Sequence, residues 1–488
     1  MIIDKYRRER IARFWKQYKR SKKGIIGLII LLTFILMAIF APLLTPYDPI
    51  RDRELAEWLA YPEWVGLINR EMADLPSNIK ISILERSLKG EGKITLSNSS
   101  AILAKVENNF LIVKSVGSAF NAEKLELELA TMFEYAFNPP KSFGIILLGK
   151  LVDSSDNFAI KASFEVVRPD GEIVRVWDSD FTLGFTRRLM VGERIYVKSS
   201  QPDLLVYLGL PIYRDTLAKK VFVSRGQYQL RAIYEFINLE PGKNVNFTLA
   251  IYEIQFIVFG LRFGLLGTDD MGRDIFTQIV YGSRVSLLIG ISASVISVSL
   301  SVLIGIIAGY VGGKTDELLT RISDLIMVLP ALPLMIVIAA MIGGGLLQIV
   351  ILLSLLGWAP GARNIRAFVL SIKNKPYIEA CKVRGAGTWR IIFKHIMPSV
   401  LPIAYAAVAL SAPIAIVTEA ELAYLGVGGD PYMISWGRML QYAQKGGAFQ
   451  YGAWWWIIPP GLCIALLSLS FVLIGHSLDE IFNPRLRR

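Results

Sequence analysis

Long apolar runs, each bounded by polar or charged residues, dominate the hydrophobic pattern of the chain. A membrane-spanning helix needs about 20 predominantly apolar residues. In chain order the segments that meet this requirement are Gly24–Leu44, Val285–Tyr310, Ile322–Ile342, Gln348–Leu370, Ser399–Glu419 and Trp455–Gly475. The first is too long for the core of a signal peptide, so we interpret it as a retained helix. The pattern predicts an α-helical membrane protein with six transmembrane helices.

The region between the first and second apolar runs has a different pattern. From about Ile79, short β-branched and aromatic runs alternate with polar residues, and turn signals such as Arg168–Gly171 separate them. The clearest strand candidates are residues 158–167, 172–183, 226–237 and 244–256. Several strands at this spacing predict a β-rich, sandwich-like domain between helices 1 and 2.

The distribution of charge predicts an orientation. The 488 residues are 53% hydrophobic, 19% charged and carry a net charge of +12. Ten Lys and Arg lie in residues 1–23 and six in residues 371–398, beside apolar spans. This is the positive-inside pattern, and it favours lipid headgroups over nucleic acid as the partner of the basic residues. Both termini are predicted to be cytoplasmic. The predicted domains are a basic tail (1–23), helix 1 (24–44), an extracellular β-rich insert (45–264) and a permease domain (265–488).

Few residues suggest chemistry. Cys381 and Cys463 cannot form a disulfide framework, and His395 and His476 have no companions at metal-ligand spacing. We therefore predict no metal, no cofactor and no catalytic residue. Two glycosylation sequons begin at Asn98 and Asn246, in the region predicted to be outside.

The stretch AGYVGGKTDE (Ala308–Glu317) resembles a phosphate-binding P-loop if Ala308 replaces the first glycine. A working P-loop follows a buried strand, whereas this stretch follows a membrane span. We interpret Gly312 and Gly313 as a tight turn between the second and third spans. ATP hydrolysis is therefore expected in partner subunits.

The inner loop PYIEACKVRGAGTWRIIFKHIMPSVLP (Pro376–Pro402) carries the most information. It resembles the E-A-A-x-x-x-G coupling loop of ABC importer permeases. The matching residues are Glu379, Ala380, Cys381 and Gly385, followed by His395 to Pro398, with Cys381 in place of the second alanine. Small side chains would let the first short helix sit in a groove of a partner, and Gly385 would end that helix. We predict that Trp389, Ile391, Ile392 and Phe393 give the second short helix an apolar face. The alternative is a basic amphipathic loop lying on lipid headgroups.

The resemblance extends to Leu265–Gly290, Gly309–Leu334 and Thr418–Leu440. These segments are similar to the peptide/nickel group of ABC permeases, and most similar to its second permease subunit. The resemblance implies the type I importer permease fold, a second homologous permease, two cytosolic ATPases and an extracellular solute-binding protein. The chain departs from the family by an insert of over two hundred residues after Thr45–Pro49.

Several residues outside these motifs also carry predictions. Glu419 and Glu421 end the fifth span, and together with Pro413 they are candidates for the substrate path or gate, although interface and capping roles are the common ones for such acids. We predict an interfacial aromatic belt at Trp454–Trp456, a local ion pair between Arg321 and Asp324, and a short helix starting at Asp269 and Asp270.

The sequence therefore predicts a permease subunit of an ATP-driven importer of oligopeptides or dipeptides in a prokaryotic cell membrane, archaeal membranes included. The mechanism implied by the resemblance is alternating access. Oligosaccharides are the alternative substrate within this class. A membrane-anchored surface receptor is the alternative from another class, and it explains the β-rich region but not the inner loop.

Overall fold

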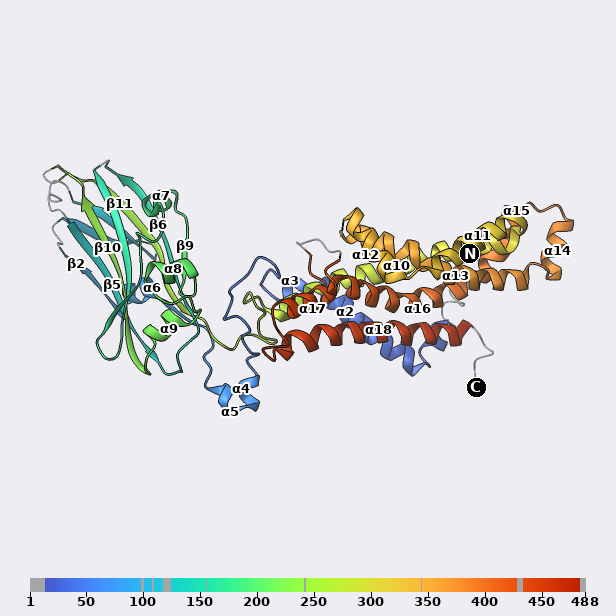
Figure 1. Ribbon diagram of the computed structural model, residues 1–488, viewed down its shortest axis with the longest axis horizontal. Coiled ribbons are helices and arrows are strands. Elements are labelled where there is room, and N and C mark those ends of the chain that lie inside the picture. Colours follow the sequence, from blue (N-terminus) through green and yellow to red (C-terminus); the bar gives the residue numbers. More distant parts are fainter. Residues whose placement is uncertain are drawn as a thin grey trace. The chain divides into compact units, whose positions relative to one another are not determined.

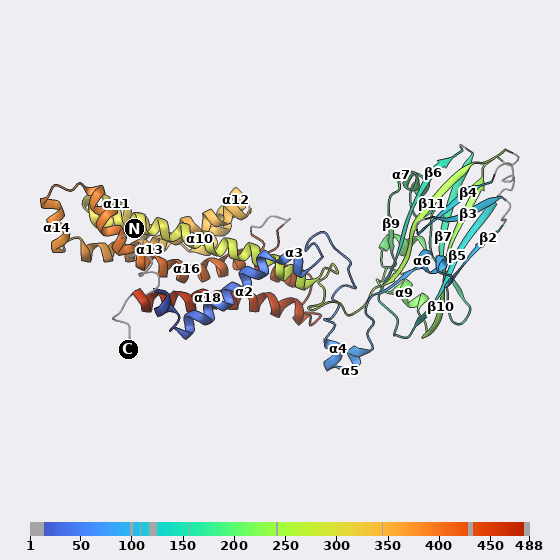
Figure 2. The same cartoon turned by 180° about the vertical axis from the view of Figure 1, so that it is seen from behind.

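The computed structural model describes residues 14–97, 101–107, 109–116, 124–155, 157–240, 243–343, 345–427 and 433–482. The chain divides into two compact units. One, the helical unit, comprises Met1–Arg53 and Arg273–Arg488, and the other, the β unit, comprises Glu54–Gly272. Figures 1 and 2 show the elements of each unit from opposite sides.

The helical unit contains α2 (Lys22–Ile39), α3 (Ala41–Leu44), α10 (Ile275–Val311), α11 (Gly313–Val328), α12 (Ala331–Ile342), α13 (Leu346–Ile372), α14 (Pro376–Val383), α15 (Thr388–Ile391), η2 (Ile392–Ile396), α16 (Met397–Tyr424), α17 (Trp436–Lys445) and α18 (Trp454–Phe482). Five helices among the described residues are long and apolar enough to cross a membrane. A sixth candidate is the pair α11 and α12, which is bent by 93°.

This bend lies inside the predicted span Ile322–Ile342. Leu329 has an extended backbone (φ −69°, ψ 136°) between the two helices. The residue before a proline is pushed out of the α conformation by the proline ring, and Pro330 follows Leu329. One apolar run therefore forms two helices that point in different directions.

Glycine allows α10 and α13 to pack closely. A Cβ atom on Gly305 would lie 2.7 Å from the carbonyl oxygen of Ala362, and one on Gly309 would lie 2.9 Å from Cβ of Val369. Ser301 Oγ also donates a hydrogen bond of 2.7 Å to the carbonyl of Trp358. Small residues that let helix backbones approach are typical of membrane helix interfaces.

The predicted turn after α10 is present. Gly312 and Gly313 both have positive φ, of 73° and 57°, in the region that favours glycine. They join α10 directly to α11, and Asp316 near the start of α11 pairs with Arg366 of α13. The stretch that resembles a P-loop is therefore a helix–helix turn.

Within the described part of the chain, the β unit contains two antiparallel sheets. The strands are β1 (Ile79–Ser82), β2 (Gly92–Leu96), β3 (Ile102–Glu107), β4 (Phe110–Ser115), β5 (Lys124–Tyr135), β6 (Phe143–Ser154), β7 (Phe158–Val167), β8 (Ile173–Asp178), β9 (Ile195–Lys198), β10 (Gly226–Asn238) and β11 (Phe247–Val258). One sheet has the order β3-β4-β11-β6-β9 with β1 beside β11, and the other has the order β2-β5-β10-β7-β8. The short helices are α4 (Val65–Ile68), α5 (Arg70–Ala73), α6 (Ile83–Leu88), α7 (Phe185–Val191), α8 (Pro202–Tyr207) and α9 (Thr216–Val221).

Aromatic side chains fill the space between the sheets. Phe256 of β11 stacks on Phe164 of β7 at a ring distance of 5.7 Å, and Phe236 of β10 stacks on Phe247 of β11 at 4.5 Å. Each of these pairs joins one sheet to the other. The alternation in residues 226–237 corresponds to β10, where every second side chain is buried. The two cysteines lie in the helical unit, so packing holds this core together without a disulfide.

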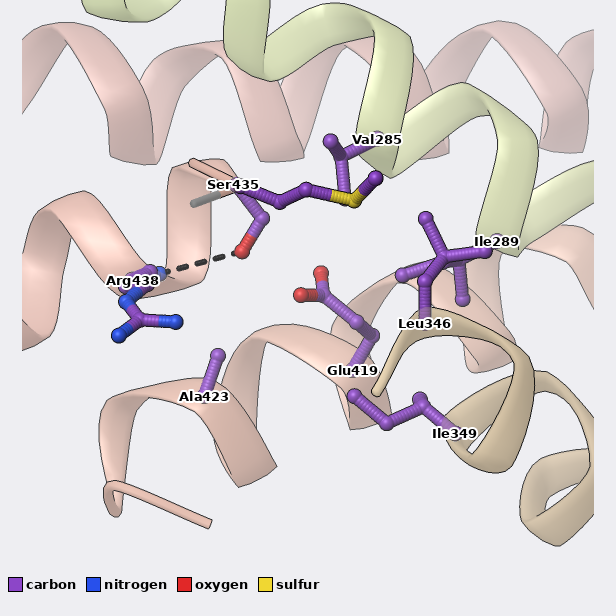
Figure 3. A pocket seen from close by; sticks show the side chains of 9 residues that line it. Val285, Ile289, Leu346, Ile349, Glu419, Ala423, Ser435 and Arg438 are labelled. Atoms are coloured by element: carbon purple, nitrogen blue, oxygen red, sulfur yellow. Dashed lines mark hydrogen bonds between the residues drawn. The ribbon is translucent and has the colours of Figure 1, made fainter. Parts of the chain in front are cut away.

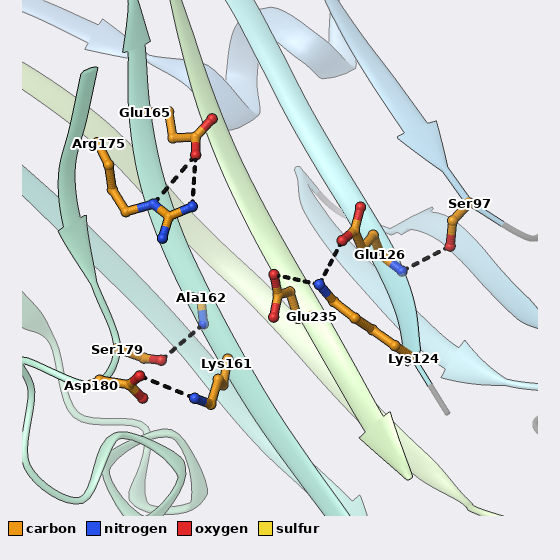
Figure 4. Close-up of polar contacts among 10 residues, drawn as sticks. All are labelled: Ser97, Lys124, Glu126, Lys161, Ala162, Glu165, Arg175, Ser179, Asp180 and Glu235. Atoms are coloured by element: carbon orange, nitrogen blue, oxygen red, sulfur yellow. Dashed lines mark hydrogen bonds and ion pairs between the residues drawn. The ribbon is translucent and has the colours of Figure 1, made fainter. Parts of the chain in front are cut away.

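The solvent-facing side of the β2-β5-β10-β7-β8 sheet carries ion pairs between strands (Figure 4). Lys124 of β5 lies 2.8 Å from Glu235 of β10 and 2.9 Å from Glu126. Arg175 of β8 lies 3.3 Å from Glu165 of β7. Pairs of opposite charge across strands support the register, each by a fraction of a kcal/mol to about 1 kcal/mol. The charges on this face therefore largely neutralise one another.

The two segments that enter and leave the β unit are hydrogen-bonded to each other. Glu54 N–H donates to Met271 O over 2.9 Å, and Leu59 N–H donates to Asp269 O over 2.9 Å. Thr45, in contrast, contacts Thr277 of α10 through their hydroxyls, 2.6 Å apart. The compact β unit consequently begins and ends about eight residues later than the predicted range 45–264.

Three local predictions need correction. Arg321 pairs with Glu317 at 2.5 Å, and Asp324 pairs with Arg363 of α13, so the predicted Arg321–Asp324 pair is wrong. Two of the three tryptophans assigned to an interfacial belt are buried, since Trp455 and Trp456 are 1% and 0% exposed.

No helix starts at Asp269 and Asp270, which lie in the turn before α10. Instead Asp274 caps α10, because its side chain accepts a hydrogen bond from Thr277 N–H over 2.9 Å.

Candidate functional site

The inner loop begins with α14 and turns at Gly385. Gly385 N–H donates to Lys382 O over 2.9 Å, and Ala386 N–H donates to Cys381 O over 3.0 Å. This pair of hydrogen bonds is the Schellman arrangement, which requires a left-handed residue just after the helix. Gly385 has φ +76°, so it ends α14 as the sequence predicted.

The second part of the loop is not a separate short helix. After Gly387, α15, η2 and α16 form one continuous helical segment, Thr388–Tyr424. Pro398 lies in the first turn of α16, directly after the π turn η2. Proline has no N–H to donate, and a π turn shifts the hydrogen bonding of the residues before it. Pro398 therefore does not interrupt the helix, which continues through the π turn into α16.

The apolar residues of the loop divide into two groups. Ile378, Ile391, Ile392 and Ile396 are at most 3% exposed and pack on residues of α10 and α13. Trp389 and Phe393 are 60% and 55% exposed, and their rings stack 6.0 Å apart. The predicted apolar face is thus formed by Trp389 and Phe393, whereas Ile391 and Ile392 belong to the core of this chain.

The exposed side of the loop also carries small and basic side chains. Glu379 and Ala380 are exposed on α14, and Val383 at its end is 88% exposed. The exposed cations are Lys382, Arg384, Arg390 and Lys394. Together with Tyr377, Trp389 and Phe393, these exposed residues between positions 377 and 394 are what we call the loop surface.

His395 and Cys381 connect the two arms of the loop. Cys381 Sγ lies 3.5 Å from His395 Nε2, so α14 contacts η2 directly. Two ion pairs lie at the nearby ends of the longer helices, Arg366–Asp316 and Arg363–Asp324. Sequence reasoning missed Asp316 and Arg366 because they are 50 residues apart along the chain.

The candidate acids of the fifth span occupy different faces of α16. Glu419 is 3% exposed, whereas Glu421 is exposed. Residues two positions apart on a helix do not share a face, so the two carboxylates point in different directions. Pro413 is buried within α16 and leaves the helix continuous.

Glu419 lies beside a small cavity of about 20 Å³ (Figure 3). Its lining residues are Val285, Ile289, Leu346, Ile349, Glu419, Ala423, Met433, Ser435 and Arg438. A larger cavity of about 250 Å³ shares Val285, Leu346 and Met433 with it, and is lined also by Tyr281 and Arg284. Ser435 also lines this cavity, and its hydroxyl points toward the Glu419 carboxylate (Figure 3).

Some predictions concern residues away from these sites. Asn246 is exposed just before β11, and Asn98 lies outside the described residues. Among the described residues, no group of three His, Cys, Asp or Glu could hold a metal ion.

Two family models match parts of this chain. Residues 301–488 match the model of the family described as "Binding-protein-dependent transport system inner membrane component". Residues 10–61 match "N-terminal TM domain of oligopeptide transport permease C".

Curated relatives give the same result. The oligopeptide transport system permease protein OppC of Bacillus subtilis is 38% identical over 222 residues, which are 46% of this chain and 72% of that protein. The dipeptide permease DppC of the same organism is 38% identical over 46% of this chain and 69% of its own. The di/tripeptide permease DppC of Pseudomonas aeruginosa is 36% identical over 46% of this chain and 73% of its own.

Among solved structures, PfGH50B aligns with 36% of this chain and 24% of its own at 13% identity and a TM-score of 0.20, too low to indicate a common fold. The family models and the identities to curated permeases are sufficient by themselves. The chain belongs to the binding-protein-dependent ABC transport permeases, in the branch that contains the oligopeptide and dipeptide permease proteins.

Proposed function

We propose that this chain is the transmembrane permease subunit of an ATP-driven importer of oligopeptides or dipeptides. The names of the three relatives support peptides over oligosaccharides. In the proposed complex it pairs with a second homologous permease and two cytosolic ATPases, and an extracellular binding protein delivers the substrate. The chain itself performs no catalysis. Counting α11 and α12 as one broken span gives the proposed six-span topology, with both termini cytoplasmic.

The observation that carries this proposal is the loop surface. Trp389, Phe393 and Val383 are exposed, and none of them belongs to the packed core of this chain. The rings of Trp389 and Phe393 stack on each other, and exposed apolar side chains that lie together are typical of protein contacts. The surrounding cations would suit an acidic rim on the ATPase, since charges of opposite sign guide association. Ala380, with its small side chain, leaves room for α14 to lie deep in a groove.

In the proposed mechanism, the helical segment that follows Gly387 transmits motion of the loop to other parts of the chain. Thr388–Tyr424 is helical throughout, so it joins the loop surface to Glu419, 31 residues further along. At 1.5 Å per residue that separation is about 45 Å along the helix. In the proposal this helical segment, which includes the π turn η2 and Pro413, moves as a unit. In the proposed alternating-access mechanism, closure of the ATPases displaces the loop, and α16 carries the displacement to the outward-facing gate.

The decisive experiment replaces an exposed residue that this chain does not need for its own fold. Val383→Asp places a charge in the proposed contact, and Val191→Asp is the matched control, because Val191 is 75% exposed at the end of α7 in the β unit. We expect Val383→Asp to abolish co-purification of the ATPase or its stimulation by peptide, while Val191→Asp keeps both. An unimpaired complex with Val383→Asp would rule out the loop surface as the ATPase contact.

The proposed orientation has its own test. In a chain without Cys381 and Cys463, a cysteine in the β unit should react with an impermeant thiol reagent added to intact cells, and a cysteine at Ser21 should not. Val152 is a suitable outer position, because it is 59% exposed. Reversed labelling would contradict the orientation and with it the ATPase-facing role of the loop.

For the β unit we propose a role in receiving the binding protein or in covering the gate. Support comes from the ion pairs of Figure 4, which leave the β2-β5-β10-β7-β8 face balanced in charge and suited to water or a polar partner. A cell-surface role separate from import is the remaining alternative for this unit. Transport measured after removal of the β unit distinguishes the two roles.

A further inference from the structure

Glu419 is a buried carboxylate within a membrane-spanning helix. It is 3% exposed, and the residues of α10 and α13 nearest to it are Val285, Ile289, Leu346 and Ile349, all apolar. An ionised carboxylate in such surroundings is costly unless a positive group or a proton neutralises it. The position therefore favours a partner that brings positive charge.

The polar groups around Glu419 come from the segment that leads into α17. Ser435 points its hydroxyl toward the carboxylate, and the Ser435 Oγ accepts the N–H of Arg438 over 3.3 Å (Figure 3). The Arg438 side chain is engaged with Tyr442, to whose hydroxyl its Nε donates over 2.8 Å. Its guanidinium also lies 5.4 Å from the centre of the same ring. Ser435 therefore brings a polar hydroxyl close to the carboxylate, but no charge.

The space beside the carboxylate has the size of one small polar group. A cavity of about 20 Å³ exceeds the volume of about 10 to 15 Å³ that one water needs. A primary ammonium group is of similar size. Because three lining residues are shared, the cavity of about 250 Å³ lies directly next to it. That volume is just below the range of about 300 to 1,000 Å³ found for whole-ligand pockets, so it suits the end of a chain.

We propose that Glu419 binds the free amino terminus of the peptide during its passage, with the first residue or two in the larger cavity. This inference rests on the proposed function, and it names the part of the substrate that the permease recognises. An ammonium group satisfies the carboxylate by charge and by hydrogen bonds, which are stronger when both groups are ionised. A neutral oligosaccharide or an N-acetylated peptide would bring no positive charge to the buried carboxylate.

The test compares trialanine with N-acetyl-trialanine as substrates of the complete importer in proteoliposomes. The transport rate of each is measured with the same saturating binding protein, for the wild type and for Glu419→Gln. For each protein, the trialanine rate is divided by the N-acetyl-trialanine rate. The binding protein is the same in both cases, so its own selectivity cancels when the wild-type ratio is compared with the Glu419→Gln ratio. Loss of one charged hydrogen bond corresponds to a change of about tenfold or more. We expect the preference for trialanine to fall by about this factor in Glu419→Gln.

Glu421→Gln is the matched control, since Glu421 is exposed two residues away, and it should keep the wild-type ratio. An unchanged ratio in Glu419→Gln would overturn the inference and leave Glu419 as a residue that fixes Ser435. If the wild type transports neither peptide, the proposed function itself fails. Should Glu419→Gln not assemble, the wild-type complex is labelled at Glu419 with dicyclohexylcarbodiimide. Slower labelling with trialanine than with N-acetyl-trialanine supports the inference, and equal labelling overturns it.

Discussion

The two units of this chain differ in the size of the side chains at their closest internal contacts. The β unit uses large aromatic residues. Of the eleven largest fully buried side chains among the described residues, eight lie in the β unit: Tyr135, Phe143, Phe164, Trp177, Phe222, Tyr228, Phe236 and Phe256. The α10–α13 contact of the helical unit relies on glycine and serine, as at Gly305, Gly309 and Ser301.

The physical reason for this difference is the solvent around each unit. In water, burial of apolar area drives packing, so a larger side chain stabilises more. In lipid the surroundings are as apolar as a leucine side chain, so burial itself gains little, and close approach with interhelical hydrogen bonds matters more. The exposed apolar residues of α2, such as Ile29 at 59% and Leu32 at 50%, fit a lipid environment.

The largest test of the comparison removes one unit altogether. We expect a chain with residues 54–272 replaced by a flexible linker to insert and assemble with its ATPase, because each unit has its own core. Transport at limiting peptide should drop while basal ATP hydrolysis persists. Transport with unchanged rate and apparent affinity would show that the β unit is not part of the import path. Cutting within β11, at Glu253, is unsuitable because it would leave the apolar end of that strand exposed.

The next test removes the centre of the aromatic core. The Phe256 ring lies within 6.4 Å of the rings of Phe133, Phe143, Phe164 and Phe222. Phe256→Ala should destabilise the β unit by about 3 to 5 kcal/mol. Calorimetry of the intact chain measures it, with the β transition identified by its absence from the chain lacking residues 54–272. Tyr213→Ala is the control, since that ring also lies in the β unit and is 72% exposed. A loss below about 1 kcal/mol for Phe256→Ala would contradict the assigned core.

The corresponding test in the helical unit adds volume instead of removing it. Gly305→Leu forces a side chain against the Ala362 carbonyl, and we expect a loss of about 1 to 3 kcal/mol or more, with reduced yield of folded protein. Gly461→Leu provides the comparison, because a Cβ there meets nothing within 4 Å. Size-exclusion chromatography in detergent and thermal unfolding report the outcome. Equal behaviour of the two variants would mean that close helix packing is not required.

A smaller energetic effect is expected at the turn of the inner loop. Gly385→Val costs about 1 to 2 kcal/mol locally, because a β-branched residue disfavours φ +76°. Nothing surrounds the position within 4 Å, so the fold and assembly should survive. ATP hydrolysis stimulated by substrate should nevertheless fall severely, since α14 would no longer end at its present angle. Normal stimulation would argue against this loop as the coupling element. Gly171→Val, at φ +86° in a turn of the β unit, controls for strain alone.

The smallest effect is expected on the charged face of the β unit. Arg231 Nε lies 2.6 Å from Glu128, in an environment that is about one quarter exposed. Arg231→Gln should lower the stability of the β unit by less than about 1 kcal/mol, and the loss should shrink further in 1 M salt. The same calorimetric transition measures it. A loss as large as that of Phe256→Ala would mean that ion pairs, and not aromatic packing, hold this unit together.

The sequence by itself determined the parts of this protein that depend on local pattern. Apolar runs of about 20 residues identify membrane helices, and alternation identifies strands such as β7 and β10, because both signals lie within one segment. The end of α14 at Gly385 also follows from local chemistry, since glycine tolerates positive φ. The resemblance of the inner loop to permeases is local for the same reason.

Only the tertiary structure decided which residues meet across the chain. Glu419 and Glu421 look alike in the sequence, but helix rotation buries one and exposes the other. Arg366 and Asp316 form a pair across two helices, which no spacing rule predicts. Trp455 and Trp456 are buried because the chain folds back on them, although their sequence is typical of a membrane interface. Local patterns fix backbone geometry, whereas side-chain partners depend on contacts between segments far apart in the chain.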